Sequence, residues 1–243
     1  MAAPAATRTK VRNRIIDLSA TNPLMVDATT LDEAISAATT RFSQDRPREV
    51  VVDVTGAGSD FYPLTGGSSV AASWVDGSSR VVSIDYPAGA VANGYTPSWL
   101  DPDNDWTTYR SASVTYLRFR NAAPSATETA RVTYTAPHTH TSVTDTVPAQ
   151  DLDALCDLAA HYACLALATK AAASQDSVIA ADSTNYRDSQ LRFKQQAEAW
   201  LASYEARMGI KEGGVAGASA TADWNRSNTV GQPWLTHHRR WGR

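Results

Sequence analysis

The spacing of apolar side chains changes twice along this chain, and this change strongly limits the possible folds. Before residue 47 and after residue 148, apolar residues recur every three or four positions, which is typical of amphipathic helices. Between residues 48 and 146 they alternate, in β-branched and aromatic runs separated by Gly, Pro, Asn and Asp clusters. The sequence therefore predicts an α+β protein, a helical bundle with an inserted antiparallel β-sandwich or half-barrel.

Four helices and at least four strands are expected. Thr30 and Glu33 have the spacing of a capping box at the start of the second helix. Pro148 should open the third helix, and Gly209 should close the fourth, which pairs antiparallel with the third. The helices are expected at about 9–18, 31–46, 149–173 and 183–208, and the strands at 49–55, 80–86, 113–120 and 129–135, with weaker candidates at 61–64 and 140–147.

These elements predict four parts. Helices at 1–47 and a helix pair at 148–210 form the bundle, and 48–147 forms the inserted β-rich domain. Residues 211–243 form an extended arm that binds a partner.

Composition narrows the class of protein. With 243 residues, 43% of them hydrophobic, the chain can bury a sizeable core, and an acidic body argues against general nucleic-acid binding. No stretch is expected to reach the roughly 20 apolar residues of a membrane span, and the first ten residues lack the apolar core of a signal peptide. Cys156 and Cys164, eight residues apart on one helix, would be roughly 12 Å apart, so free buried thiols and synthesis in the cytoplasm are expected.

The last twenty residues hold three of the seven tryptophans and four arginines, behind a Gly/Ala/Ser/Thr-rich stretch. Trp and Arg contribute most affinity when a partner desolvates them, so this segment is interpreted as a tether ending in an anchor. A disordered terminus is the alternative. The residues expected to bind the partner are Trp224, Arg226, Trp234, Leu235, Arg239, Arg240 and Trp241.

Candidate metal sites are incomplete. Asp101, Asp103 and Asp105 alternate as calcium ligands do, but Trp106 stands where a calcium loop needs Gly and Ala112 where it needs Glu. A solvated acidic turn is expected instead. His138 and His140 could share one side of an extended segment, but two ligands do not make a zinc site, so exposed histidines at a strand edge are expected.

Catalytic motifs are also missing. The chain has no Gly-x-Ser-x-Gly elbow, and its Gly-rich stretch at 65–68 lacks the lysine of a phosphate loop. We therefore expect no enzyme, cofactor or catalytic residue. Trp74, Trp99 and Trp106 could stack on sugars or nucleic-acid bases, although core or rim positions in a small sheet are more common for such residues. A carbohydrate- or receptor-binding tail module is therefore the alternative function.

Three stretches carry a resemblance to a known family. They are the helix 31–42 leading through Arg46-Pro47 into 49–54, the pair Asp60-Phe61-Tyr62-Pro63-Leu64 and Val82-Ser83-Ile84-Asp85-Tyr86-Pro87, and Val147-Pro148 opening an Ala/Leu helix that precedes Tyr186, Ser189, Phe193, Ala197 and Tyr204. Over residues 11–209 the chain resembles the head-to-tail connector, or adaptor, proteins of tailed bacteriophages.

The resemblance implies a structural protein of the virion neck. Such a subunit would form a homododecameric ring under the portal, bind the portal and the next neck or tail protein, and continue the channel through which DNA passes without sequence-specific binding. It implies a helical part around the channel and a C-terminal segment that docks on the portal through the arm tryptophans. No membrane is implied.

Overall fold

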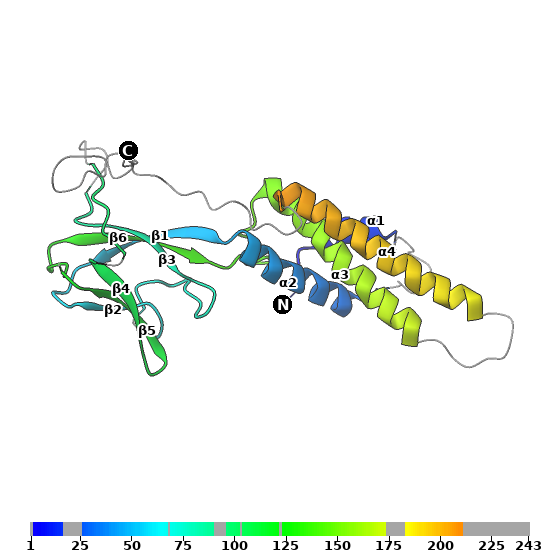
Figure 1. Ribbon diagram of the computed structural model, residues 1–243, viewed down its shortest axis with the longest axis horizontal. Helices are drawn as coiled ribbons and strands as arrows, with labels where there is room; N and C mark the ends of the chain where they lie inside the picture. Colours follow the sequence, from blue (N-terminus) through cyan, green and yellow to red (C-terminus); the bar gives the residue numbers. More distant parts are fainter. Residues whose placement is uncertain are drawn as a thin grey trace, which may run out of the picture. The chain divides into compact units, whose positions relative to one another are not determined.

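In a computed structural model of the chain, residues 2–16, 26–67, 69–89, 96–102, 104–121, 123–173 and 183–210 are described. The predicted α+β class is confirmed, with helices before and after two three-stranded antiparallel sheets (Figure 1). In chain order the elements are α1 (Ala5–Ile15), α2 (Ala28–Asp45), β1 (Arg48–Thr55), β2 (Phe61–Pro63), β3 (Val81–Asp85), β4 (Trp106–Ser111), β5 (Val114–Phe119), β6 (Thr129–Ala136), the 3-10 turn η2 (Ala149–Asp151), α3 (Leu152–Ala173) and α4 (Ser183–Met208).

Contacts divide the chain into two units, Met1–Tyr204 and Glu205–Arg243. In the second unit, the described residues complete α4. Gly209 ends this helix as predicted, with a φ of 69° that favours glycine, and the Ile210 N–H donates to Glu205 O at 2.9 Å.

Helix α3 is the central helix of the bundle, and both α1 and α2 pack against it (Figure 1). Two hydrogen bonds join it to α4. His161 Nδ1 lies 2.9 Å from Ala197 O, and Ser203 Oγ donates to Asp157 Oδ2 at 2.8 Å. Residue numbers fall along α4 as they rise along α3, so the predicted antiparallel pairing is confirmed.

The hydropathy of this central helix corrects one sequence prediction. The segment Ala149–Ala173 is long and apolar enough to cross a membrane by length and composition alone, although no such stretch was expected. Its most apolar window is 61% buried within the protein. The apolar composition is therefore that of a core helix. Cys156 and Cys164 lie there as the predicted free thiols, and burial raises the pKa of each to about 11.

The start of α2 also differs from the prediction. Asp27, not Thr30, is the N-cap, because its carboxylate accepts the Thr30 N–H at 2.6 Å and the helix already begins at Ala28. This bond lowers the pKa of Asp27. Thr30 is therefore inside the first turn, and the capping-box prediction is wrong. Both residue types are good caps, so residue type alone does not choose between them.

The sheets have the strand orders β1-β6-β3 and β2-β5-β4, with every pairing antiparallel. Five of the strands match predicted ranges. Strand β4 was missed because its threonines, tyrosine and arginine show little apolar alternation after the acidic turn. The weak candidate at 140–147 is not a strand; only one isolated bridge joins His140 and Asp145.

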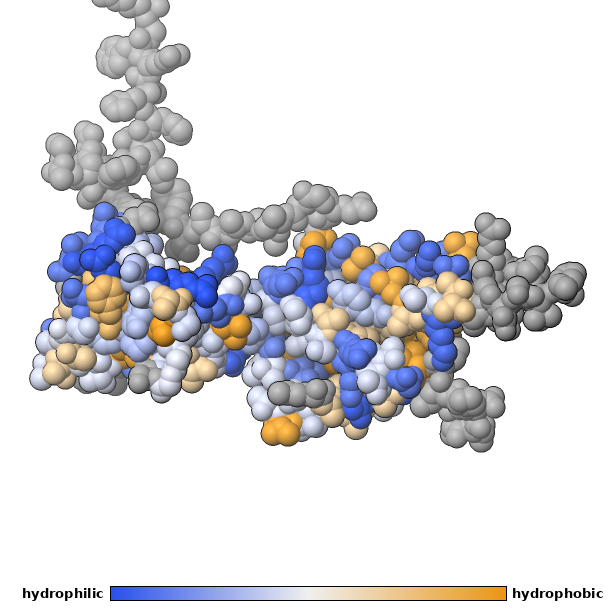
Figure 2. Space-filling view, turned by 90° about the horizontal axis from the view of Figure 1, so that it is seen from below, coloured by the Kyte–Doolittle hydropathy of each residue, from blue (hydrophilic) through white to orange (hydrophobic). Residues whose placement is uncertain are grey.

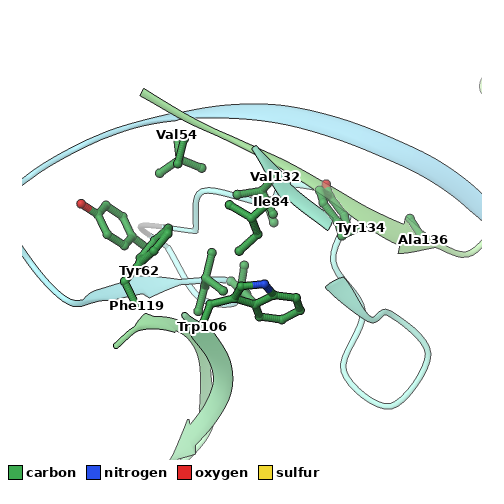
Figure 3. Packing of buried hydrophobic residues seen from close by; sticks show 12 residues of the cluster. Val54, Tyr62, Ile84, Trp106, Phe119, Val132, Tyr134 and Ala136 are labelled. Carbon is green, nitrogen blue, oxygen red and sulfur yellow. The ribbon is translucent and has the colours of Figure 1, made fainter. Parts of the chain in front are cut away.

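One apolar core lies between the two sheets (Figure 3). On β5, Leu117 and Phe119 are buried and Arg118 is exposed, as the predicted alternation requires. Burying each large side chain contributes roughly 1.5–3 kcal/mol. The core residues are Val54, Tyr62, Leu64, Ala71, Ile84, Trp106, Leu117, Phe119, Ala130, Val132, Tyr134 and Ala136.

On the face shown in Figure 2, apolar side chains lie in small groups among polar ones. The exposed large apolar residues include Val51, Phe61, Trp99, Tyr109 and Leu191, which come from different elements. Exposure of single apolar residues is ordinary for folded proteins, but the exposed Phe61 and Tyr109 rings contact each other, with centroids 5.9 Å apart.

Candidate functional site

The predicted partner-binding residues of the arm, from Trp224 to Trp241, lie outside the described residues. Their role stays a prediction. The described residues offer three other features, which are the two histidines, the acidic turn and a cavity in the β-sandwich.

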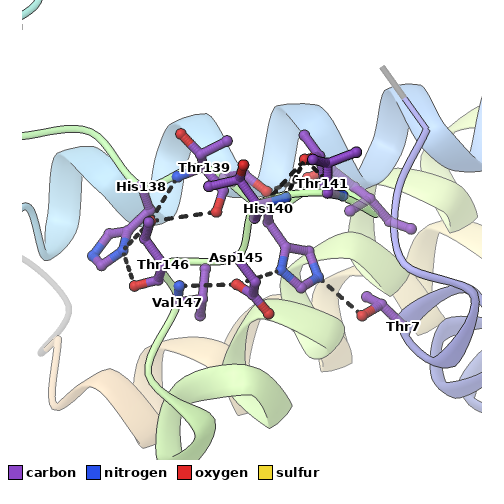
Figure 4. Close-up of polar contacts among 12 residues, drawn as sticks. Thr7, His138, Thr139, His140, Thr141, Asp145, Thr146 and Val147 are labelled. Carbon is purple, nitrogen blue, oxygen red and sulfur yellow. Dashed lines mark hydrogen bonds and ion pairs between the residues drawn. The ribbon is translucent and has the colours of Figure 1, made fainter. Parts of the chain in front are cut away.

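The two histidines are buried, so the prediction of exposed histidines at a strand edge is wrong. His138 is 8% exposed and His140 is 7% exposed. His138 Nδ1 lies 2.9 Å from Thr146 O (Figure 4). Its Nε2 lies 3.0 Å from Arg46 O. The ring also packs against Phe42, with centroids 5.1 Å apart.

Two carbonyl oxygens therefore face one imidazole. A neutral imidazole carries a single N–H and donates to one of them at a time, whereas an imidazolium donates to both. The backbone N–H of His138 donates to Ser43 Oγ at 2.9 Å. His138 thus joins the end of α2 to the segment that leads back into the helices.

His140 connects the same segment to the first helix. Its Nε2 lies 2.9 Å from Thr7 Oγ1, and its Nδ1 lies 2.9 Å from Asp145 Oδ1, which also accepts the Val147 N–H (Figure 4). Neither histidine is arranged as a metal ligand, because all four ring nitrogens have protein partners. The pair is a structural junction between the bundle and the inserted β-domain.

The acidic turn is closed by its own hydrogen bonds. Asp105 Oδ2 accepts the Asp101 N–H at 2.9 Å, and Asp105 Oδ1 accepts from Asn121 Nδ2 at 3.1 Å. These two bonds, with the larger effect from Asp101, lower the pKa of Asp105. Asp103 lies outside the described residues. Among the described residues, no group of three His, Cys, Asp or Glu side chains could hold a metal ion.

A cavity of about 390 Å³ opens where the edge strands of the two sheets, β3 and β4, approach each other. Its wall combines two tryptophans, two arginines, one carboxylate and several hydroxyl groups. The lining residues include Trp74, Asp76, Arg80, Trp106, Arg110 and Thr115.

The carboxylate is held in place by the wall. Asp76 Oδ1 accepts the Trp74 indole N–H and the Thr115 hydroxyl, each at 2.9 Å. The bond from Trp74, then that from Thr115 and the nearby charge of Arg110, keep the pKa of Asp76 below its ordinary value. Asp76 is therefore a fixed anion, and the Trp74 ring is fixed with it.

The loop that carries these residues is internally bonded. Ser79 Oγ accepts the Val75 N–H at 2.9 Å, and the Ser79 N–H donates to Val75 O at 2.8 Å. Gly77, at φ 82°, makes the turn between them. The Arg80 N–H donates to Thr135 Oγ1 at 3.0 Å, which attaches the loop to β6.

The structure brings together two of the three tryptophans that the sequence singled out. Trp74 and Trp106 line the cavity, whereas Trp99 is 63% exposed and does not line it. Arg80, Arg110 and Asp76 were missed by the sequence analysis, because nothing in their spacing shows that three elements meet. The only local signal is Trp74 and Asp76, two positions apart.

The fold and these contacts define an α+β protein in which a helical bundle and a β-sandwich meet at a buried histidine junction. No family model matches the chain, and no curated protein matches it. Solved structures with weak similarity come from gene transfer agent particles.

Two of these similar chains come from the neck of an empty particle, computed with C6 symmetry, and from the virion of a native particle. Each is 13% identical to this chain, with a TM-score of 0.28. A third, from the neck of a native particle computed with C12 symmetry, is 14% identical, with a TM-score of 0.27. All three matches cover 80% of this chain and 92% of the other.

Proposed function

We propose that this chain is a structural virion protein, the head-to-tail connector subunit of a tailed bacteriophage. Twelve copies form a ring under the portal, bind the portal and the next neck or tail protein, and continue the DNA channel. The protein is made in the host cytoplasm and then resides in the virion neck. It has no enzymatic role, no cofactor and no membrane partner.

The observation that carries this proposal is the inserted architecture. The chain leaves the bundle after α2, forms the sandwich, and returns to the bundle at α3. His138 contacts both crossings, through Arg46 O and Thr146 O. This is the organisation that the resemblance to phage connectors implies, and it suits a subunit whose parts contact different neighbours.

The proposed parts are those expected from the sequence: bundle helices at 1–47 and 148–210, a β-domain at 48–147, and an arm at 211–243. An arm that binds a partner adds a second contact at high local concentration, so it strengthens attachment without enlarging the folded core. The net charge of the chain is −3 at pH 7. A mildly acidic channel wall would not hold the DNA phosphates, which must slide past it.

The test is reconstitution of the full-length chain with purified portal rings, followed by imaging and mass measurement. We expect rings of twelve equivalent copies bound to the portal face, with the same ring present in mature particles. A chain that stays monomeric beside portal rings, and that is missing from purified virions, would overturn the proposal.

A further inference from the structure

The cavity between β3 and β4 has an excess of positive charge. Arg80 and Arg110 line it, and neither guanidinium forms an ion pair within the described part of the chain. Asp76 is the acidic residue of the lining, and its Oδ1 already accepts two hydrogen bonds. Guanidinium groups bind carboxylates through paired N–H donors, so the cavity is suited to a ligand that carries a carboxylate.

The other walls suit a sugar ring. The Trp74 indole is half-buried and locked by its bond to Asp76, which leaves it as a fixed apolar surface. Beside it, Ser79, Thr108 and Thr115 supply hydroxyl groups, and Asp76 Oδ2 remains as an acceptor for ligand hydroxyls. Amphipathic ligands need this combination of one aromatic surface and several polar groups.

The cavity is preformed, because its loop is hydrogen-bonded to itself and to β6. The N–H groups of Val75, Ser78, Ser79 and Arg80 all have partners within the protein. These bonds hold the loop in place around the cavity. Its volume of about 390 Å³ lies in the roughly 300–1,000 Å³ range of small-molecule sites.

We propose that this cavity is a binding site for a sugar acid, a uronic-acid residue of an acidic polysaccharide. Arg80 and Arg110 bind its carboxylate, the Trp74 ring stacks on its apolar face, and Asp76 and the hydroxyl side chains bind its hydroxyl groups. The site is independent of ring assembly, because all of its residues belong to the sandwich of one subunit.

The first experiment titrates the full-length protein with an oligoglucuronate and with the matched neutral glucose oligomer. The readout is the ¹H–¹⁵N signal of the Trp74 indole, which is assigned by its loss in Trp74→Phe. We expect a saturable shift with the uronate, at least tenfold weaker binding of the neutral oligomer, and weaker uronate binding at high salt. No saturable shift, or equal binding of the two oligomers, would overturn the proposal.

The second experiment compares Arg110→Gln and Arg80→Gln with the control Arg118→Gln. Arg118 is exposed on the opposite face of β5, 5.4 Å over the Phe61 ring, so its loss removes the same charge outside the cavity. Each cavity variant should bind the uronate at least tenfold more weakly at unchanged circular dichroism, and the control should bind as the parent does. Equal losses in all three variants, or tighter binding of an acidic peptide to the cavity, would reject the sugar-acid site.

Discussion

Arg14 Nε lies 2.6 Å from Asp157 Oδ1, and this carboxylate has no exposed surface. The pair joins α1 to the central helix, and Ser203 of α4 donates to the other oxygen of the same carboxylate. Burial acts to lower the pKa of Arg14, but its hydrogen bond to Asp157 and the nearby negative charges raise it above its ordinary value. The hydrogen bond therefore holds the partly buried Arg14 guanidinium against a fully buried carboxylate.

Removing one member of this pair should destabilise the bundle strongly. We expect Asp157→Ala to lower the free energy of unfolding by about 3 kcal/mol, because Arg14 is left without its buried partner. Arg14→Ala combined with Asp157→Ala should cost clearly less than the sum of the single changes, as measured by chemical denaturation. The control is Asp53→Ala, which removes an exposed ion pair with Arg131 in the β-domain, at 51% side-chain exposure of Asp53, and should cost under about 1 kcal/mol. Additive single effects would contradict the coupling.

The histidine junction gives a second prediction. His138→Phe keeps a ring of similar size beside Phe42 but removes the ring nitrogens that face Arg46 O and Thr146 O. We expect a loss of about 2 kcal/mol in unfolding free energy, and faster hydrogen exchange at the Thr139 and Thr146 amides. His138→Gln, which retains amide donors, should lose less. If both variants match the parent protein in exchange and stability, the junction is not a stabilising contact.

Stability should fall at alkaline pH because of Tyr204. Burial, followed by the 2.7 Å hydrogen bond to Asp45 Oδ2, raises the pKa of this phenol above its ordinary value of 10.0. Above pH 10 the unfolded phenol loses its proton while the folded one retains it, so the folded state binds more protons and unfolding becomes easier as pH rises. Tyr204→Phe keeps most of the packing and removes this titration.

The measurement is the unfolding midpoint in denaturant from pH 8 to pH 11 for both proteins. At pH 8, Tyr204→Phe should be less stable by about 1–2 kcal/mol, since the bond to a carboxylate is lost. Above pH 10 the two curves should converge. Parallel curves over the whole range would show that Tyr204 does not ionise differently in the two states.

The N-cap of α2 can be checked by two single changes. Asp27→Ala removes the acceptor of the Thr30 N–H and should lower the thermal midpoint measurably. Thr30→Ala leaves that backbone bond in place and should change the midpoint less. A larger drop in the thermal midpoint for Thr30→Ala than for Asp27→Ala would support the capping box that the sequence predicted.

The arm gives a prediction for assembly. Deleting residues 213–243 should leave the circular dichroism and thermal unfolding of the body unchanged while weakening attachment to portal rings. Replacing Trp234 and Trp241 by Ala should reproduce most of that loss, since a buried interface aromatic contributes about 2 kcal/mol or more. Pelleting with portal rings measures the attachment. Unfolding of the truncated chain would show that these residues belong to the core.

Secondary structure was predictable here to the extent that each signal was local. Leu117 and Phe119 alternate with exposed neighbours, and Gly209 ends α4, because side-chain spacing and backbone freedom act within a few residues. Strand β4 was missed for the complementary reason. Its residues pair with β5 across a short turn, and only Trp106 is buried, so apolar periodicity carried little information.

The amino-acid sequence alone determined the α+β class, the insertion of strands between helices, and the two free thiols of the central helix. Tertiary structure decided that the histidines are buried, that Asp27 caps α2, and that Arg80, Arg110 and Trp74 line one cavity. The physical reason is distance along the chain. Periodicity reports which face of an element is apolar, whereas the contact of His138 with Arg46 joins residues 92 positions apart and exists only once the elements have packed.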